Sequence, residues 1–273
     1  MNKSTPSRGA TWLAALTDSA DVLPGYPASV RVVDAPLAGQ PARYIAVVPD
    51  AQSRYPRART GETGLIEGWA LAQAVQEAMA ADATDRDRDG VKRAIVAVID
   101  VSSQAYGRRE EAFGIHEALA GAAGAYAQAR LCGHPVIGLI VGKAMSGAFL
   151  AHGYQANRLI ALNDDGVMVH AMGKAAAARV TLRSVEDLER LAADVPPMAY
   201  DLASYATLGL LWKRVDVQSA EQPSASDLEV VRRTLVAALD NIRNDTRPDL
   251  RSRLGGVNRQ ASSLVRERLQ AQW

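Results

Sequence analysis

The 273-residue sequence is poor in cysteine and contains no long apolar run. Its one cysteine, Cys132, leaves no disulfide framework within the chain, so we expect a reducing compartment. The N-terminal segment lacks the apolar stretch of a signal peptide, and no apolar run reaches the ~18 residues that would span a bilayer. These absences predict a cytoplasmic protein without a membrane segment.

The sequence also lacks an excess of charge of either sign. It carries 31 Lys and Arg residues against 30 Asp and Glu residues, so there is no basic field to attract nucleic acid. No histidine pair has the spacing of a zinc site with a cysteine or glutamate partner. We therefore predict neither a nucleic-acid partner nor a metal centre.

Aromatic residues make up only 5% of the chain, while alanine is abundant. This composition favours a core of aliphatic side chains and close helix contacts. Continuous apolar runs alternate with helical patterns, which predicts an α/β fold with parallel strands. The expected strands cover 43–50, 93–100, 136–141, 157–162, 166–173 and 210–217, and the two longest expected helices cover 65–82 and 112–133.

The sequence divides into three parts by composition. Residues 1–40 are rich in Pro, Gly and polar residues and are expected to form an N-terminal arm with one short helix near Trp12–Leu16. Residues 41–245 form the main domain, in which Ser226 and Glu229 have the spacing of a capping box. Residues 246–273 end in an amphipathic helix. We expect the arm and the last helix to bury surface against a partner.

The stretch VIGLIVGKAMSGAFLAHG, Val136–Gly153, begins as a buried strand and continues in small residues. A helix packed tightly on its neighbours would explain the small residues. Alternatively, Ser146 is the nucleophile of a strand-to-helix elbow, with Asp164, Asp165 and His170 following in the order of a catalytic triad. Those residues follow within about 25 positions, which leaves little chain to assemble a triad.

A third interpretation needs no nucleophile. The first N–H groups of a helix have no partner within it, and small side chains allow a ligand oxygen to reach them. Such a turn is an oxyanion hole, in which one donor typically contributes ~2.7–4 kcal/mol of transition-state stabilisation. Local pattern alone leaves this interpretation and the packed helix equally open.

The ordered set of segments resembles the carboxyltransferase branch of the crotonase superfamily. The stretches RARTGETGLIEGWALAQAV, IDVSSQAYGRREEAFGIHEALAG and GLIVGKAMSGAFLAHGYQANRLIAL are similar to the gamma subunits of biotin-independent malonate decarboxylase. Acyl-CoA carboxyltransferases usually read Thr-Pro-Gly-Ala-Tyr at the first turn and Gly-Gly-Ser-Gly-Gly at the second. Here the first turn, 102–106, keeps Ala-Tyr, and the second, 144–148, keeps Ser-Gly.

The resemblance implies a crotonase (ClpP-like) spiral fold of ββα units of the carboxyltransferase type. It also implies a carboxy-lyase subunit that acts with a homologous beta subunit, in a hetero-oligomer that serves malonate catabolism. The substrate is a malonyl group on the phosphopantetheine-type prosthetic group of an acyl carrier subunit, loaded by an acyl-carrier transferase subunit. The products are an acetyl thioester and CO2, and the gamma subunit itself binds no cofactor directly.

The implied site lies at the two turns. The backbone N–H groups of Ser146, Gly147 and Ala148 form the expected oxyanion hole for the substrate carboxylate, while the beta subunit cradles the thioester oxygen. The pocket is expected to be lined by substrate-binding residues Gln104, Ala105, Tyr106 and Met145.

The group that protonates the carbon remains open: it is water, Tyr106, a partner group, Asp100 or Glu62. The alternatives are the alpha-like half of a biotin-dependent acyl-CoA carboxyltransferase, a non-catalytic scaffold subunit and a serine hydrolase.

Overall fold

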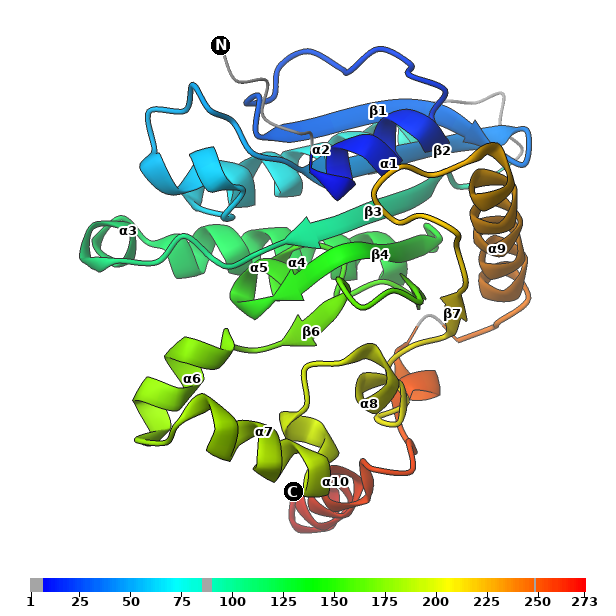
Figure 1. The fold of residues 1–273 in the computed structure, drawn as a ribbon. Helices are drawn as coiled ribbons and strands as arrows, with labels where there is room; N and C mark the ends of the chain where they lie inside the picture. Colours follow the sequence, from blue (N-terminus) through cyan, green and yellow to red (C-terminus); the bar gives the residue numbers. More distant parts are fainter. Residues whose placement is uncertain (1–6, 85–89, 248) are drawn as a thin grey trace.

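The computed structural model describes residues 7–84, 90–247 and 249–273 (Figure 1). In this part of the chain a seven-stranded sheet has the order β1-β2-β3-β4-β5-β7, with β6 paired to β4 beyond the end of β5. β1 and β2 are antiparallel, and the other neighbours are parallel. The strands are β1 (Val30–Leu37), β2 (Gln40–Val47), β3 (Ala94–Val101), β4 (Val136–Met145), β5 (Arg158–Leu162), β6 (Met168–His170) and β7 (Lys213–Val215).

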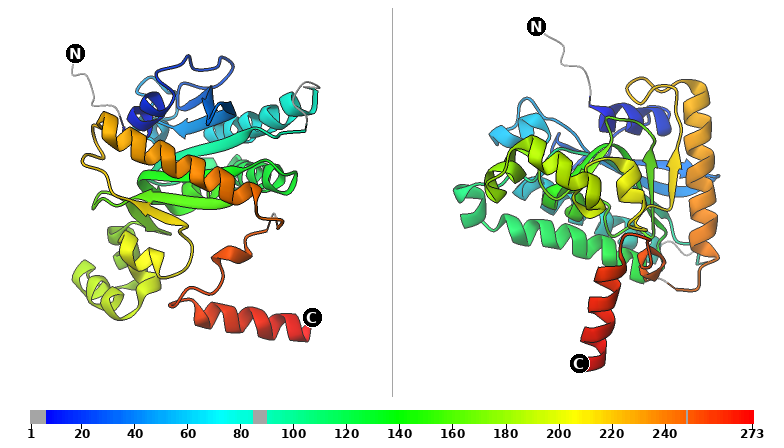
Figure 2. Two further views of the ribbon diagram at one scale, coloured as in Figure 1. Left: turned by 90° about the vertical axis from the view of Figure 1, so that its right-hand side faces the viewer. Right: turned by 60° about the horizontal axis from the view of Figure 1, so that its bottom comes forward.

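Helices cover both faces of the sheet. α2 (Leu65–Thr84) and α4 (Ile115–Leu131) lie on one face, and α1 (Arg8–Leu16) and α9 (Ala225–Arg243) lie on the other (Figures 1 and 2). The central strands are buried almost throughout, as expected for parallel strands covered on both sides. The predicted α/β layering with parallel pairing is therefore observed.

Close packing of α2 against α4 requires a small residue where the two helices cross. A Cβ atom added to Gly68 in α2 would lie only 2.8 Å from the backbone carbon and oxygen of Ala118 in α4. The two helices approach so closely that only glycine fits at this crossing, because backbone atoms cannot move aside cheaply. The expectation of close helix contacts in an alanine-rich protein is met here.

The N-terminal part differs from the expected arm. Trp12 and Leu13 in α1 are buried in the core, and the Trp12 indole N–H donates to the Ala220 carbonyl at 2.8 Å. β1 forms a hairpin with β2 through Ala38 and Gly39, which both have positive φ. Residues 8–40 thus belong to the main fold; the polar segments that flank α1 and β1 concealed their apolar pattern. Residues 1–6 lie outside the described residues.

The C-terminal half supplies smaller helices at one end of the sheet. The capping box of α9 is formed by Ser224 and Asp227, two residues before the predicted pair, because aspartate reaches the N-cap backbone as well as glutamate.

α10 extends away from the body of the molecule (Figure 2). The helices not yet placed are α3 (Arg108–Ala112), α5 (Ser146–Ala151), α6 (Lys174–Thr181), α7 (Val185–Asp194), α8 (Leu202–Ala206) and α10 (Gln260–Gln272).

Among the residues described, no helix combines the length and the apolar character needed to cross a membrane.

Candidate active site

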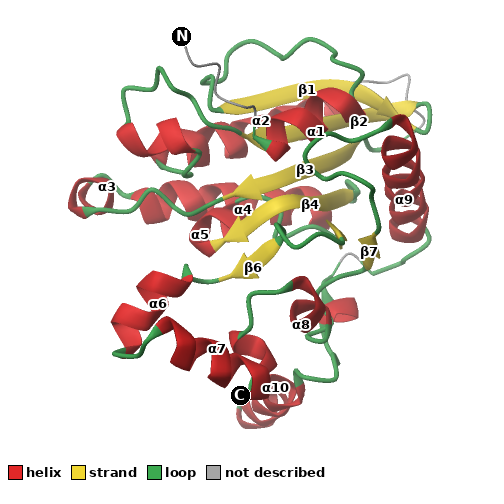
Figure 3. Cartoon of the chain, in the orientation of Figure 1, coloured by secondary structure: helices red, strands yellow, loops and turns green. Residues whose placement is uncertain are grey.

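The candidate site lies where β3, β4 and β6 end on the same side of the sheet and their loops lead to α3, α5 and α6 (Figure 3). Ligands of parallel α/β sheets bind at the carboxyl ends of strands. β3 and β4 also change register between Ile99 and Val101, next to these ends. Irregular pairing of this kind often redirects side chains at a binding site.

Ser146 forms a sharp turn between β4 and α5. Its φ of +63° lies in the left-handed region, where a residue with a side chain is strained by about 1–2 kcal/mol. The helical geometry leaves the N–H groups of Ser146, Gly147 and Ala148 without intrahelical acceptors.

The second turn, residues 102–106 after β3, is held by the segment before α2. The buried Thr63 donates its N–H to the Ser103 carbonyl at 3.0 Å and accepts from the Ala105 N–H at 2.8 Å. These two bonds enclose Gln104 and fix its backbone. The Ala105 N–H is therefore used within the protein.

The two turns are joined by a hydrogen bond that the sequence did not predict. The Gly147 N–H donates to Gln104 Oε1 at 3.0 Å. A Cβ at position 147 would lie 2.0 Å from that oxygen, so the glutamine occupies the space beside the glycine. In this structure the Gly147 N–H is paired with Gln104, whereas it was expected to be a free donor to the substrate.

A cavity of about 1010 Å³ opens in front of the two turns. Gln104, Tyr106, Met145, Ser146 and Gly147 all line it. The structure thus brings together five of the seven predicted site residues.

The other two, Ala105 and Ala148, are buried and are not part of the lining.

Tyr106 is held at the mouth of the cavity by charged neighbours. The Arg57 guanidinium carbon lies 5.6 Å from the centroid of the Tyr106 ring, and Arg57 is paired with Glu62 at 3.1 Å. Asp100 has a structural role: it accepts the N–H groups of Gly9 at 3.2 Å and Lys143 at 3.1 Å. Neither Glu62 nor Asp100 is an evident proton donor, because Glu62 is paired with Arg57 and Asp100 accepts two backbone N–H groups.

The predicted triad is not assembled. His170 Nδ1 lies 2.9 Å from the Met172 oxygen, and its ring stacks on Tyr200. Asp164 is paired with Arg8 at 2.6 Å. No hydrogen bond in the described part of the chain joins Ser146 to His170 or Asp164, so the hydrolase interpretation loses its geometric basis.

Sequence reasoning missed two tyrosines that line the cavity. The hydroxyls of Tyr200 and Tyr205 are buried and find no partner among the described residues. Burial raises the pKa of both phenols, so both stay protonated and can donate. The only signal was two tyrosines within PPMAYDLASYATLG, a segment interpreted as a single helix, whereas the structure divides it into a 3-10 turn (Pro196–Met198) and α8.

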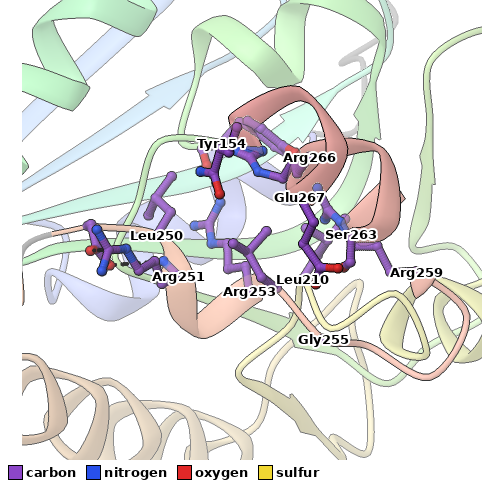
Figure 4. A pocket seen from close by; sticks show the side chains of 13 residues that line it. Tyr154, Leu210, Leu250, Arg251, Arg253, Gly255, Arg259, Ser263, Arg266 and Glu267 are labelled. Atoms are coloured by element: carbon purple, nitrogen blue, oxygen red, sulfur yellow. Dashed lines mark hydrogen bonds and ion pairs between the residues drawn. The ribbon is translucent and has the colours of Figure 1, made fainter. Parts of the chain in front are cut away.

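A second cavity of about 1010 Å³ lies between α10 and the body (Figure 4). Its wall contains Arg253, which donates to the Tyr154 carbonyl at 2.6 Å and to the Ala156 carbonyl. Desolvation lowers the pKa of Arg253 to about 10. These bonds fasten the C-terminal segment to the loop before β5. The cavity contains neither strand-end turn, and we do not assign the chemistry to it.

A family model described as the malonate decarboxylase gamma subunit matches residues 58–273. The chain belongs to the malonate decarboxylase gamma subunit family. The match covers both turns and the cavity. It confirms the family that the sequence resembles.

Two solved chains from malonate decarboxylase assemblies match almost the whole of this chain. The chain is 63% identical to one chain of a Pseudomonas malonate decarboxylase hetero-tetramer in complex with coenzyme A, with a TM-score of 0.92, covering 98% of this chain and 100% of that one. It is 61% identical to a chain of the Pseudomonas MdcD-MdcE hetero-dimer, with a TM-score of 0.88 and coverage of 98% and 99%.

Two more distant matches are carboxyltransferases. The malonyl-S-ACP:biotin-protein carboxyltransferase MADD of Malonomonas rubra is 35% identical over 147 residues, which are 54% of this chain; the chain matches only 50% of that protein's length. Transcarboxylase 12S, at 19% identity, has a TM-score of 0.63 over 90% of this chain and 44% of its own. This likeness confirms the predicted crotonase-type α/β fold of the carboxyltransferase branch.

Proposed function

We propose that this gamma subunit, paired with a homologous beta subunit, decarboxylates a malonyl thioester to an acetyl thioester and CO2. The solved relatives at 61–63% identity are chains of malonate decarboxylase assemblies, one of them a hetero-dimer. Their near-complete coverage of this chain supports the same pairing here. The catalytic cavity then lies between the two subunits.

The observation that carries the proposal is the absence of charge in the cavity. None of its described lining residues is Asp, Glu, Lys or Arg. Burial lowers the pKa of His170, so its imidazole is neutral at pH 7. This subunit therefore offers a bound carboxylate neutral donors and no cation.

That environment suits decarboxylation. As the bond between the α-carbon and the carboxyl carbon breaks, its electron pair moves into the thioester enolate and CO2 leaves. A cation beside the carboxylate would stabilise the ground state more than the transition state, in which the charge has spread away. Neutral N–H donors hold the carboxylate but stabilise the ground state less than a cation would. The barrier to decarboxylation is therefore raised less.

The residues of the two turns then have distinct tasks. The Ser146 N–H supports the carboxylate, and the Ser146 hydroxyl assists or caps α5, whereas the buried Ala148 does not line the cavity. The Gly147 N–H acts through Gln104. Tyr106 and Met145 shape the pocket, and the beta subunit cradles the thioester oxygen. The α-carbon takes its proton from water, Tyr106 or the partner.

The substrate is expected to arrive on the phosphopantetheine-type group of an acyl carrier subunit, loaded by a transferase subunit. The gamma subunit itself needs no cofactor for this step. α10 is the segment best placed to pack on a partner, since Leu264, Val265 and Leu269 are exposed along it.

A biotin-dependent carboxyltransferase is the second candidate, because one relative is a malonyl-S-ACP:biotin-protein carboxyltransferase. The experiment incubates the purified beta–gamma complex with malonyl-pantetheine, with and without biotin, and measures acetyl-pantetheine and CO2. We expect equal CO2 release in both. Acetyl-pantetheine formed only with biotin, with the carboxyl group recovered on biotin and not as CO2, would replace decarboxylation by carboxyl transfer. No acetyl-pantetheine in either case would leave the scaffold role.

A serine-directed phosphonate addresses the hydrolase alternative in the same preparation. Because no base contacts Ser146 in the described structure, we expect no covalent adduct at this residue. A stoichiometric adduct found there by peptide mass spectrometry would restore the nucleophile.

A further inference from the structure

The Gln104 carboxamide lies between the two turns, and only part of its hydrogen-bonding capacity is used. Its backbone is enclosed by the two bonds to Thr63, and its carbonyl accepts from the Tyr106 N–H at 3.0 Å and the Ser103 hydroxyl at 3.0 Å. The side chain crosses to α5, where Oε1 accepts the Gly147 N–H at 3.0 Å. Both the origin and the oxygen end of this side chain are therefore fixed.

The bond to Gly147 also determines the orientation of the amide. A peptide N–H can only donate, so the end of the carboxamide that faces it must be the oxygen. The Nε2 amino group, with its two N–H donors, then points in another direction within the amide plane. Gln104 lines the uncharged cavity, and none of the described residues accepts a hydrogen bond from Nε2.

We propose that Gln104 determines specificity for the malonyl group by donating from Nε2 to its free carboxylate. This inference rests on the proposed decarboxylation. A neutral amide can hold a carboxylate without adding a positive charge to the cavity. Because the acetyl product has no carboxylate, it loses this bond, so Gln104 favours the substrate over the product. Gly147 positions the amide by holding its oxygen.

The same geometry allows two competing roles, and each makes a different prediction. If Oε1 merely occupies the Gly147 N–H, the substrate must displace it, and removing the glutamine should strengthen malonyl binding. If the bond to Gly147 only stabilises the turn, any side chain that accepts this hydrogen bond should suffice.

Two substitutions separate these roles in the beta–gamma complex. Gln104→Glu keeps an acceptor for the Gly147 N–H but removes both Nε2 donors and adds a negative charge that repels the substrate carboxylate. Gln104→Met removes acceptor and donors at similar length. Gln128→Met, on the exposed side of α4, is the matched control for the loss of an amide. The measurements are the KM for malonyl-pantetheine and the inhibition constant of acetyl-pantetheine, with thermal melting and size-exclusion chromatography to verify folding and assembly.

We expect Gln104→Met to raise the malonyl KM roughly ten- to a hundred-fold, the range for one hydrogen bond to a charged group. Gln104→Glu should raise it at least as much, and both variants should leave the acetyl inhibition constant unchanged. The control should alter neither constant. If the malonyl KM were near normal in Gln104→Glu but raised in Gln104→Met, Gln104 would have only a structural role.

A lower malonyl KM in Gln104→Met would show that the side chain blocks the site, and equal weakening of both ligands would also overturn the proposal. If the wild-type complex itself released no CO2, the proposed function would fail. With wild-type turnover intact, an unchanged KM in both variants would refute the role of Gln104 alone.

Discussion

Replacing Gly147 by alanine perturbs the contact between the two turns from the side opposite Gln104. The new Cβ would lie 2.0 Å from Gln104 Oε1 and 3.1 Å from its Cδ, whereas the next neighbour, Leu119 Cδ1, is 3.5 Å away. Gly147 is not among the residues with positive φ, so alanine fits the backbone. Only the end of a flexible side chain has to move. We therefore expect Gly147→Ala to fold with Gln104 displaced.

The displacement is large enough to break the hydrogen bond. A carbon–oxygen contact of about 3.3 Å requires Oε1 to retreat by more than about 1 Å from an N–H that now donates at 3.0 Å. Losing one neutral hydrogen bond costs about 1 kcal/mol, and alanine in place of glycine in a helix offsets roughly 0.5–1 kcal/mol. The free energy of unfolding should thus stay within about 1 kcal/mol of wild type.

The effect on substrate binding should be much larger than the effect on stability. Once Gln104 is displaced, its Nε2 no longer points at the carboxylate, so the KM for malonyl-pantetheine should rise about ten- to a hundred-fold. The double variant Gly147→Ala/Gln104→Met should be no worse than either single variant, because both remove the same interaction. Steady-state kinetics of the four complexes measures this coupling, and urea unfolding measures stability.

Gly124→Ala in α4 is the matched control. A Cβ there meets no atom within 4 Å, so this variant should be stabilised by roughly 0.5–1 kcal/mol and should keep its KM. A wild-type KM in a well-folded Gly147→Ala complex would refute the claim that this contact positions Gln104. A decreased KM would mean that the glutamine obstructs the site.

Two further predictions concern stability. Gly68→Ala should lower the free energy of unfolding by about 1–3 kcal/mol, because its Cβ meets the Ala118 backbone at 2.8 Å; urea unfolding beside Gly124→Ala checks this, and a neutral result would show that α2 and α4 separate easily. Burial lowers the pKa of His152 to about 4, so the unfolded chain, in which an imidazole has a pKa near ~6.5, binds a proton that the folded chain does not. The contribution of neutral His152 to the free energy of unfolding is therefore complete above pH ~6.5. It declines by on the order of 3 kcal/mol as the pH falls toward ~4. Unfolding of wild type and His152→Gln at pH 7.5 and 5 should show a smaller loss in the variant, and equal losses would contradict the cause.

Much of the fold could be predicted from local sequence patterns. The buried strands at 93–100 and 136–141 are continuous apolar runs, and helix α4 follows an alanine-rich pattern that ends at Gly133. These signals reflect periodicity and burial, which are recorded in neighbouring residues. The N-terminal helix and hairpin were missed because their apolar residues are short runs between polar segments, and only packing against the sheet makes them core.

The sequence predicted two turns beside one pocket, and the structure places residues of both turns in the lining of one cavity. Small residues after β4 indicate that another group comes close to the backbone, and at Gly147 that group is the side chain of Gln104. The partner of the Gly147 N–H is a glutamine 43 residues away in the chain, and no local pattern reports such a bond. The sequence likewise did not predict that the hydroxyls of Tyr200 and Tyr205 are buried without a partner among the described residues. Their burial depends on how the segment around α8 packs beside the cavity.

The sequence by itself therefore determined the family, the alternation of buried strands with helices, and the two turns proposed to carry the site. Those features depend on residue types that act over one or two turns of chain. The tertiary structure alone decided which N–H groups are already paired, which side chains make the cavity uncharged, and where the Gln104 amide can direct its donors. Such features depend on distances between segments far apart in the chain, which only the packed molecule defines.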